Sequence, residues 1–389
     1  MTARDFLQKP IIKRIIRICC LMFAGLIIAH LVLKENSVYW QDMTFHSMST
    51  YVTYRLYLRD KDCAAPVFKI VNGSFRDMNA MCNRFDPQSE LARLNASAYK
   101  DKFRCSPELW ALLLKAREMY DLSGGAFDIS IGPLTAIWKN RFRKTLPTDE
   151  EIAAAKEKVG LNKVIFYKDE MSVRFTVEGM SLDLGGIAKG AALDLAKERL
   201  EGKTAIGAEL SEDASFMAWL EARFRGKATD LDCGFINAGG NVITLSEPPP
   251  KEEQYTVRIQ NPVDPKGAPC ASAGMLDESV STSGNYERYV VIDGKHYTHI
   301  VDPVSGRPVE NMLSVTVITK HAVDADALST AIFIKGKDFA VEMKEKFPDL
   351  RVLMFYIDPA RPGQVQTFSI GEWKDIKVPV LPESAIKQR

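Results

Sequence analysis

A carboxylate and a hydroxyl at helical spacing are the first residues in this sequence whose types suit chemistry. Asp326 and Thr330 lie four positions apart within Asp324–Thr330, so a helix would place both on one face. Together they offer the hard oxygen ligands that Mg²⁺ prefers when a substrate phosphate also binds the ion. The alternative is structural, with a capping Asp and a Thr hydroxyl bonded to the helix backbone.

A histidine within Tyr297–Pro303 is the best candidate for a general base. Histidine ordinarily titrates near pH 6.5, so His299 suits removal of a proton from a hydroxyl group. His296 is the nearest rival, and in a strand it would face the opposite side of the sheet. A purely structural histidine is the alternative. The hydroxyl-rich segment Ser281–Tyr286 precedes them, and as a turn containing glycine it suits contacts with phosphate.

Two glycine-containing segments suit a ligand that carries phosphate and hydroxyl groups. In Leu182–Ala192, a strand, two glycines and a helix start would point backbone N–H groups and Lys189 at an anion. The spacing fits neither a Walker A loop nor GxGxxG. In Ser123–Asp128, two glycines precede Asp128, whose carboxylate could accept a ribose or ribityl hydroxyl. Tight strand–helix packing and a helix C-cap are the respective alternatives. Together the four segments predict a phosphate-bearing substrate, a magnesium ion and a base.

The overall composition is that of a folded, nearly neutral protein of enzyme size. The 389 residues are 46% hydrophobic and 26% charged, and the formal net charge is +1. These values exclude extensive disorder and a whole-protein field that attracts nucleic acid. The mean hydropathy of −0.12 excludes a multi-pass membrane protein.

The N-terminus carries the one long apolar run. Residues 1–36 hold six Lys or Arg and two acids, and most of the bases precede the sixteen-residue run Ile18–Leu33. This pattern predicts a signal-anchor helix at about 18–33, with the N-terminus in the cytoplasm of a bacterium and residues 37–389 in the periplasm. A cleaved signal peptide is the alternative, although the run does not end in the small residues of a cleavage site.

Helices and strands must bring the segments with candidate site residues together. Helices and strands do not alternate strictly along the chain, and this order indicates an α+β fold. We expect one body over residues 37–389, with an insertion at about 203–232 that contains a helix near 211–225. Strands are predicted at 43–58, 162–167, 171–177, 233–245, 254–260, 288–292, 296–300, 313–319 and 351–357. Helices are predicted at 66–85, 107–124, 149–160, 187–200, 324–334 and 337–347.

The motifs, taken in order, resemble the ApbE family of FAD:protein FMN transferases from about residue 44 to about 357. The resemblance rests on nine collinear segments: Met48–Thr50, Phe85–Asn95, Gly125–Asp128, Gly132–Leu134 with Trp138, Leu182–Gly190, Ala238–Asn241, Ser281–Tyr286, His299–Pro303 and Asp326–Ala331. The family fold is α+β and related to a duplicated T-fold.

The resemblance implies a Mg²⁺-dependent transfer of FMN from FAD to a Thr or Ser hydroxyl of an acceptor protein, with release of AMP. By the same resemblance, His299 is the base and Mg²⁺ binds the Gly186 carbonyl, Asp326 and Thr330. The implied FAD-binding residues are Met48, Phe85, Ala126, Phe127, Asp128, Asp183 and Lys189. The implied acceptor is a subunit of a membrane electron-transfer complex or another exported flavoprotein.

Three departures from the family pattern stand out. Ser49 occupies a usual glycine position, Phe85 a usual tyrosine position, and the 203–232 segment is additional. Two other functions stay open, namely a carrier that holds FAD without transferring it and a pyrophosphatase that yields FMN and AMP. The presence of both His299 and the Asp326–Thr330 pair favours the transferase over a carrier, because storage needs neither.

Overall fold

An eight-stranded antiparallel sheet organises the chain in the computed structural model. The residues described are 14, 17–25, 39–58, 63–138, 145–202, 231–287, 289–292, 294–361 and 363–381. The strands, in their order across the sheet, are β1 (Tyr39–Ser47), β2 (Thr50–Leu58), β6 (Leu231–Ala238), β7 (Asn241–Thr244), β10 (Ser279–Gly284), β13 (Met312–Thr319), β14 (Arg351–Ile357) and β15 (Val365–Ile370).

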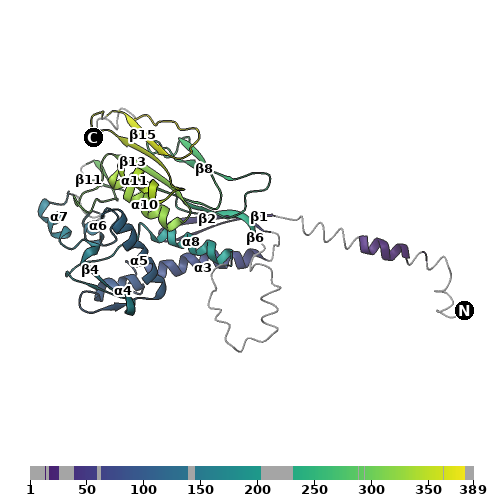
Figure 1. The fold of residues 1–389 in the computed structure, drawn as a ribbon, viewed down its shortest axis with the longest axis horizontal. Helices are drawn as coiled ribbons and strands as arrows, with labels where there is room; N and C mark the ends of the chain where they lie inside the picture. Colours follow the sequence, from purple (N-terminus) through teal and green to yellow (C-terminus); the bar gives the residue numbers. More distant parts are fainter. Residues whose placement is uncertain are drawn as a thin grey trace.

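Helices pack against one face of this sheet, and smaller sheets complete the body. In Figure 1, α10 lies between β13 and α8, and α8 lies beside α3. The helices are α3 (Ala64–Cys82), α4 (Glu90–Ser97), α5 (Pro107–Leu122), α6 (Gly132–Trp138), α7 (Asp149–Lys156), α8 (Ala188–Leu200), α10 (Ala322–Lys335) and α11 (Lys337–Lys346). The smaller sheets are β3 (Phe103–Arg104) with β5 (Ser172–Phe175) and β4 (Val164–Tyr167), β8 (Tyr255–Ile259) with β9 (Ala271–Met275), and β11 (Tyr289–Ile292) with β12 (Lys295–Thr298).

The central strands are buried on both faces. Val315 and Val317 of β13 join the main core with α8 and α10. On β14, Leu353 and Phe355 point the other way and pack with residues of β8 and β9. Alternate residues of a strand face opposite sides, so this double burial needs apolar residues at successive positions. The mixed α+β prediction is confirmed.

Short sequence patterns predicted the starts of two helices correctly. The Ser106 side chain caps α5, and Pro107 occupies its first turn. Thr148 and Glu151 form the predicted capping box of α7, although this helix ends at Lys156 rather than at residue 160. Such caps satisfy N–H groups that the helix itself leaves free, so short sequence patterns predict them well.

The single strand predicted over 43–58 is wrong, because the chain reverses in its middle. β1 and β2 pair as a hairpin whose turn contains Met48 and Ser49. Both turn residues have positive φ, 50° and 59°. A two-residue hairpin turn of this kind favours glycine or asparagine, and neither is present to mark it. The family's glycine at the position of Ser49 therefore has a conformational explanation, namely the left-handed backbone there.

Two further predictions about local structure need correction. No regular strand precedes Gly185, because both backbone polar groups of Leu182 bond to the Asn95 side chain, at 2.7 and 3.0 Å. Residues 281–284, predicted to lie in a turn, belong to strand β10. Strands β9 and β15 were not predicted.

The N-terminal helix and the insertion lie largely outside the described residues. Residues 17–25 are helical and exposed, and the remainder of the predicted 18–33 anchor is not described. No helix among the described residues is long and apolar enough to cross a membrane. The predicted helix at 211–225 falls within 203–230, which is also outside the described part.

A cluster of charged side chains ties α8 to the turn between β9 and β10. Lys197 donates to both the Asp277 carboxylate and the Thr244 carbonyl, and Lys320 donates to the other oxygen of Asp277. Partial burial raises the pKa of Asp277, but the hydrogen bonds from the two lysines outweigh this effect and lower the pKa to about 2. The ionised carboxylate therefore stabilises the folded state.

We predict that Asp277→Asn lowers the free energy of unfolding by about 1–2 kcal/mol at neutral pH, since charge-assisted hydrogen bonds are lost at a partly exposed site. The pKa of Asp277 is lower in the folded than in the unfolded chain. Its contribution is therefore fully present above about pH 4 and disappears as the pH falls towards about 2. Urea unfolding from pH 7 to pH 3 measures this, with exposed Asp349→Asn as control. A difference between wild type and variant that does not change with pH would contradict the assignment.

Candidate active site

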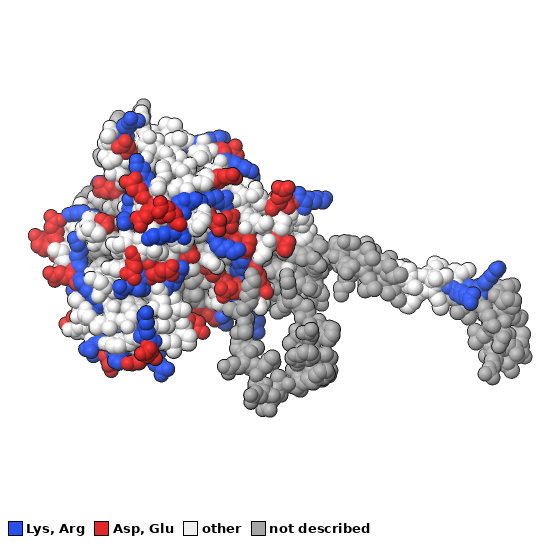
Figure 2. Space-filling model, viewed as in Figure 1, with Lys and Arg blue, Asp and Glu red and all other residues white. Residues whose placement is uncertain are grey.

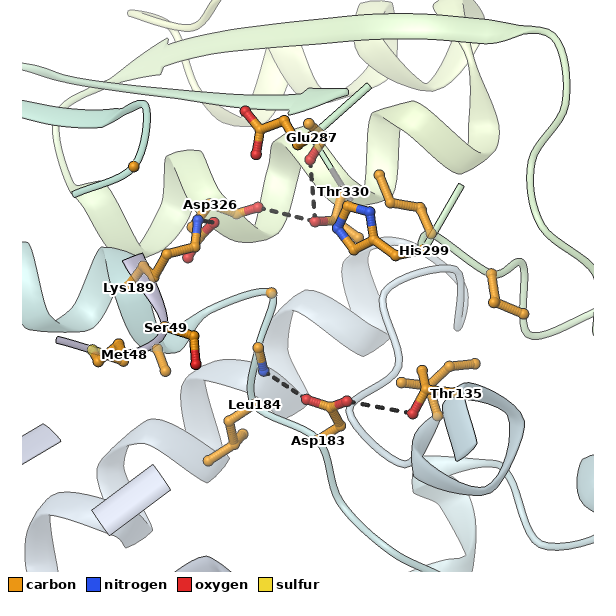
Figure 3. A pocket seen from close by; sticks show the side chains of 18 of the residues that line it. Met48, Ser49, Thr135, Asp183, Leu184, Lys189, Glu287, His299, Asp326 and Thr330 are labelled. Carbon is orange, nitrogen blue, oxygen red and sulfur yellow. Dashed lines mark hydrogen bonds and ion pairs between the residues drawn. The ribbon is translucent and has the colours of Figure 1, made fainter. Parts of the chain in front are cut away.

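Every site residue predicted from the sequence lines one cavity of about 1130 Å³. Its walls come from the β1–β2 turn, the loop before α6, the start of α8, the loop after β12, and α10. The predicted residues that line it are Met48, Phe85, Ala126, Phe127, Asp128, Asp183, Gly186, Lys189, His299, Asp326 and Thr330. In Figure 3, Glu287, Thr330 and His299 lie along one side of the view, and Asp183 and Thr135 along the other. Their convergence is structural fact, whereas the role of each remains a prediction.

Asp326 is buried and held from several directions. Its Oδ2 atom accepts from the Gly190 backbone N–H at 3.0 Å, and Lys189 Nζ lies 3.5 Å from Oδ1. The side chain is only 6% exposed. A buried carboxylate is costly unless donors surround it, and here the donors come from α8. The start of α8 and the middle of α10 are therefore linked through this one side chain.

Thr330 presents its hydroxyl oxygen to the same region. The Thr330 hydroxyl donates to the Asp326 carbonyl at 3.3 Å, so the back-bonded threonine that the sequence left open is present. With its hydrogen directed at the helix, the Thr330 hydroxyl oxygen lies 3.4 Å from Ser283 Oγ, which can donate to it, and one lone pair is left for the predicted cation. A Cβ atom on Gly186 would lie 3.5 Å from Thr330 Oγ1, which shows how closely the α8 start approaches α10.

The start of α8, predicted as an anion site, is already partly bonded to protein groups, and no strand leads into it. Ile187 at the N-cap position provides no side-chain hydrogen bond. The Ala188 N–H donates to the Leu184 carbonyl at 2.9 Å, and the Gly190 N–H donates to Asp326 Oδ2 at 3.0 Å. A Cβ atom on Gly186 would lie 3.2 Å from the Phe127 ring. Glycine at 186 thus keeps the backbone of this turn close to the cavity wall.

Asp183 forms an ion pair that sequence reasoning missed. Arg84 donates to Asp183 Oδ2 at 3.0 Å and to the Thr135 hydroxyl at 3.1 Å. The Gly185 N–H donates to Asp183 Oδ1 at 3.0 Å. Arg84 also stacks on Phe85, 5.0 Å from the ring centre, while Phe85 stays 80% exposed. Its position immediately before a predicted aromatic site residue was the available signal.

Asp128 is more enclosed than a simple hydroxyl acceptor needs to be. Burial raises its pKa, while hydrogen bonds from Ser130 lower it. The Ser130 N–H and hydroxyl both donate to Asp128 Oδ1 at 2.7 Å. The Leu161 backbone N–H also bonds this carboxylate. The local fold therefore already holds Asp128, and its contact with a ribose or ribityl hydroxyl stays a prediction.

The two rival histidines occupy different environments, but not for the reason that the sequence suggested. β12 ends at Thr298, so His299 lies beyond the strand and strand alternation does not apply to it. His299 lines the cavity, whereas His296 is exposed and stacks on Tyr289 with ring centres 4.4 Å apart. The cavity also includes Glu287, which sequence reasoning missed although it directly follows the Ser281–Tyr286 segment.

The fold and the site together define a flavin transferase of the ApbE type, and comparison with known proteins agrees. The chain belongs to the ApbE family, whose profile matches residues 48–209 and 222–354. It is 29% identical, over 306 residues, to a Klebsiella pneumoniae protein named FAD:protein FMN transferase; the match covers 78% of this chain and 84% of that protein. A protein of the same name from Treponema pallidum is 29% identical over 297 residues, which cover 73% and 74% of the two chains.

Solved structures support the fold. The crystal structure of an ApbE protein from Thermotoga maritima superposes with a TM-score of 0.66 at 27% identity, covering 81% of this chain and 94% of that one. The flavin transferase ApbE from Vibrio cholerae gives a TM-score of 0.67 at 20% identity, with 86% and 97% covered. At 20% identity the second comparison supports the fold alone.

We predict opposite effects of two glycine-to-alanine substitutions. A Cβ atom on Gly190 would lie 2.2 Å from the Ala322 carbonyl oxygen, so Gly190→Ala forces α8 and α10 apart. Overpacking of this kind costs about 1–3 kcal/mol. Gly73 lies inside α3 with open space around it, and Gly73→Ala should stabilise the fold by up to about 1 kcal/mol.

Urea unfolding of both variants measures the difference, and the rate of FMN transfer should fall only in Gly190→Ala. Equal stability of the two variants would show that the helix crossing tolerates a side chain and would contradict this prediction.

Proposed function

We propose that this protein is an FAD:protein FMN transferase that joins FMN to a Thr or Ser hydroxyl of an acceptor protein and releases AMP. The observation that carries the proposal is the meeting, in one cavity, of the His299 side chain, the Asp326–Thr330 pair and the start of α8. A base, an oxygen-rich cation site and an anion site are the three parts that transfer of a phosphoryl-linked group requires.

The oxygen atoms present fit a magnesium ion that is completed by substrate. Among the described residues no cluster of three or more His, Cys, Asp or Glu could hold a metal, so an all-protein cage is not built there. One carboxylate, one hydroxyl and the Gly186 carbonyl suit Mg²⁺, which typically takes few protein carboxylates together with substrate phosphates. When bound, the ion neutralises charge that develops on the pyrophosphate.

The protein's own groups bind and orient FAD. We place the pyrophosphate at the start of α8, where a helix N-terminus and the positive side chain of Lys189 favour an anion. The exposed ring of Phe85, backed by Arg84, offers a surface on which a flat flavin or adenine ring can stack. Met48, Ala126, Phe127, Asp128 and Asp183 complete the binding wall.

His299 supplies the base. A threonine or serine hydroxyl is a weak nucleophile at neutral pH, so a positioned acceptor for its proton lowers the barrier. His299 takes this proton as the hydroxyl oxygen bonds to the FMN phosphorus. The phosphorus–oxygen bond to the AMP half then breaks, and its electron pair leaves with AMP. The product is a phosphoester between FMN and the acceptor.

One assay separates this proposal from the carrier and pyrophosphatase alternatives. The protein is incubated with FAD, Mg²⁺ and a candidate acceptor domain, and the products are run on a denaturing gel. A fluorescent flavin band on the acceptor supports the transferase, free FMN with AMP supports the pyrophosphatase, and unchanged FAD supports the carrier. We propose that the natural acceptor is a subunit of a membrane electron-transfer complex or another exported flavoprotein.

We predict that His299→Ala retains FAD binding but loses about 10²–10⁴-fold in FMN transfer, the usual contribution of a general base. His296→Ala is the control, because this exposed residue stacks on Tyr289 outside the cavity and should lose little. Flavin fluorescence quenching measures binding, and gel fluorescence measures transfer. If transfer survives in the first variant and collapses in the second, the base is misassigned.

We also propose that residues 1–36 anchor the protein in the bacterial inner membrane, with the body in the periplasm. The basic residues before the 18–33 run support this topology. Protease added to intact spheroplasts should then digest the chain from residue 37 onward, as detected by blotting. Full protection of the body would overturn the topology, and a mature chain that lacks the N-terminal segment would indicate cleavage instead.

A further inference from the structure

A buried polar pair lies behind Asp326, on the sheet side of α10. Ser281 on β10 and Asn241 at the start of β7 are 1% and 2% exposed. Ser281 Oγ lies 2.8 Å from Asn241 Oδ1 and 3.4 Å from Asp326 Oδ1. Buried polar groups of this kind are costly unless hydrogen bonds satisfy them, so their place behind a predicted metal ligand calls for a physical explanation.

The Ser281 hydroxyl has one hydrogen and three possible acceptors, because Ser329 Oγ lies 3.5 Å away in addition to Asn241 Oδ1 and Asp326 Oδ1. If it donates to Asn241 Oδ1, Asp326 receives nothing from it, and the Asn241 amide nitrogen is left without a partner in the described part of the protein. An unpaired, buried N–H₂ group carries the full cost of desolvation. This arrangement therefore leaves the Asn241 amide nitrogen unpaired and gives Asp326 Oδ1 no hydrogen bond from Ser281.

Rotation of the Asn241 amide by 180° resolves the conflict. The amide nitrogen then donates to Ser281 Oγ, and the Ser281 hydrogen becomes available for Asp326 Oδ1. The oxygen that takes the former place of the nitrogen is an acceptor, and unpaired buried acceptors are tolerated better than unpaired donors. The chain of hydrogen bonds then runs from Asn241 through Ser281 to Asp326.

We propose that Asn241 and Ser281 act together as positioning residues that orient the Asp326 carboxylate for Mg²⁺ binding. The inference rests on the proposed function, because it takes Asp326 as a metal ligand. With the Gly190 N–H bonded to Oδ2 and Ser281 to Oδ1, each carboxylate oxygen has a fixed donor, and Lys189 Nζ also lies 3.5 Å from Oδ1. The carboxylate cannot then rotate freely, and its remaining lone pairs keep one direction before the ion arrives.

Strand β10 offers a matched control. Ser279 lies two positions before Ser281 and therefore on the same face of the strand. It is equally buried, but its hydroxyl donates to the Val242 carbonyl at 3.0 Å rather than towards Asp326. Ser279→Ala and Ser281→Ala thus remove the same atom from equivalent packing, and only the second removes a donor to Asp326.

The test measures binding of Mn²⁺, a paramagnetic substitute for Mg²⁺, by electron paramagnetic resonance with FAD present and no acceptor. Loss of a group that hydrogen-bonds a metal ligand typically weakens metal affinity about 10–100-fold, and we expect this range for Ser281→Ala. Ser279→Ala should bind Mn²⁺ like wild type. FMN transfer by Ser281→Ala should need correspondingly more Mg²⁺ but approach the wild-type rate at saturation.

A double-variant cycle tests the pairing itself, and melting temperatures confirm that each variant folds. Asn241→Ala should weaken Mn²⁺ binding by itself, and the double variant should be no weaker than Ser281→Ala, because both changes break one chain of bonds. The inference would be overturned if the losses of Mn²⁺ affinity in Asn241→Ala and Ser281→Ala multiplied in the double variant. It would also be overturned if Ser281→Ala and Ser279→Ala bound Mn²⁺ equally well. If Asp326→Ala binds Mn²⁺ like wild type, the proposed metal site fails first, which separates the two failures.

Discussion

The contact between α8 and α10 at Gly190 and Ala322 is the constraint on which the site depends. The helices approach so closely that no side chain fits at Gly190, and the Gly190 N–H is free to bond Asp326. Asp194, one turn along α8, accepts the first backbone N–H groups of α10 at 2.8 Å, from Ala322 and Val323. Burial raises the pKa of Asp194 to about 6, although these two hydrogen bonds favour the charged form. One crossing thus sets the position of the anion site at the start of α8 relative to the oxygen ligands on α10.

Burial of polar groups at this crossing has an energetic cost that an ordinary core avoids. Val315 and Val317 pack against the same helices through apolar contacts alone, whereas Asp326 and Ser281 need partners at defined distances. Such groups contribute less to stability than apolar residues of the same volume. Their presence is consistent with a fold that gives up some stability to hold a carboxylate at the cavity wall.

The cavity is assembled from helices, a turn and loops. The predicted cation and anion sites lie on the packed helices α10 and α8, while His299 lies in a loop just beyond the short β11–β12 hairpin. The exposed Phe85 and the β1–β2 turn form other parts of the wall. A substrate as long as FAD can therefore be fixed at its pyrophosphate by the helices, while the acceptor approaches past loops. Figure 2 shows positive and negative side chains intermixed on one face of the body, so neither sign dominates there.

The sequence alone determined the features that depend on near neighbours, namely the caps at Ser106 and Thr148 and the mixed α+β class. The motifs, through their resemblance to the ApbE family, also predicted the eleven residues that line the cavity. Those motifs indicate chemistry because residue types and their order can be recognised without knowing the distances between side chains in space. Only the tertiary structure decided the rest. Local propensity does not encode the turn at Met48 and Ser49 or the end of β12 before His299. It also does not encode the ion pair of Arg84 with Asp183 or the hydrogen bonds from Ser281 and Gly190 to Asp326. Their positions follow from how the sheet, α8 and α10 pack, because a hydrogen bond between residues 136 positions apart exists only once both helices are in place.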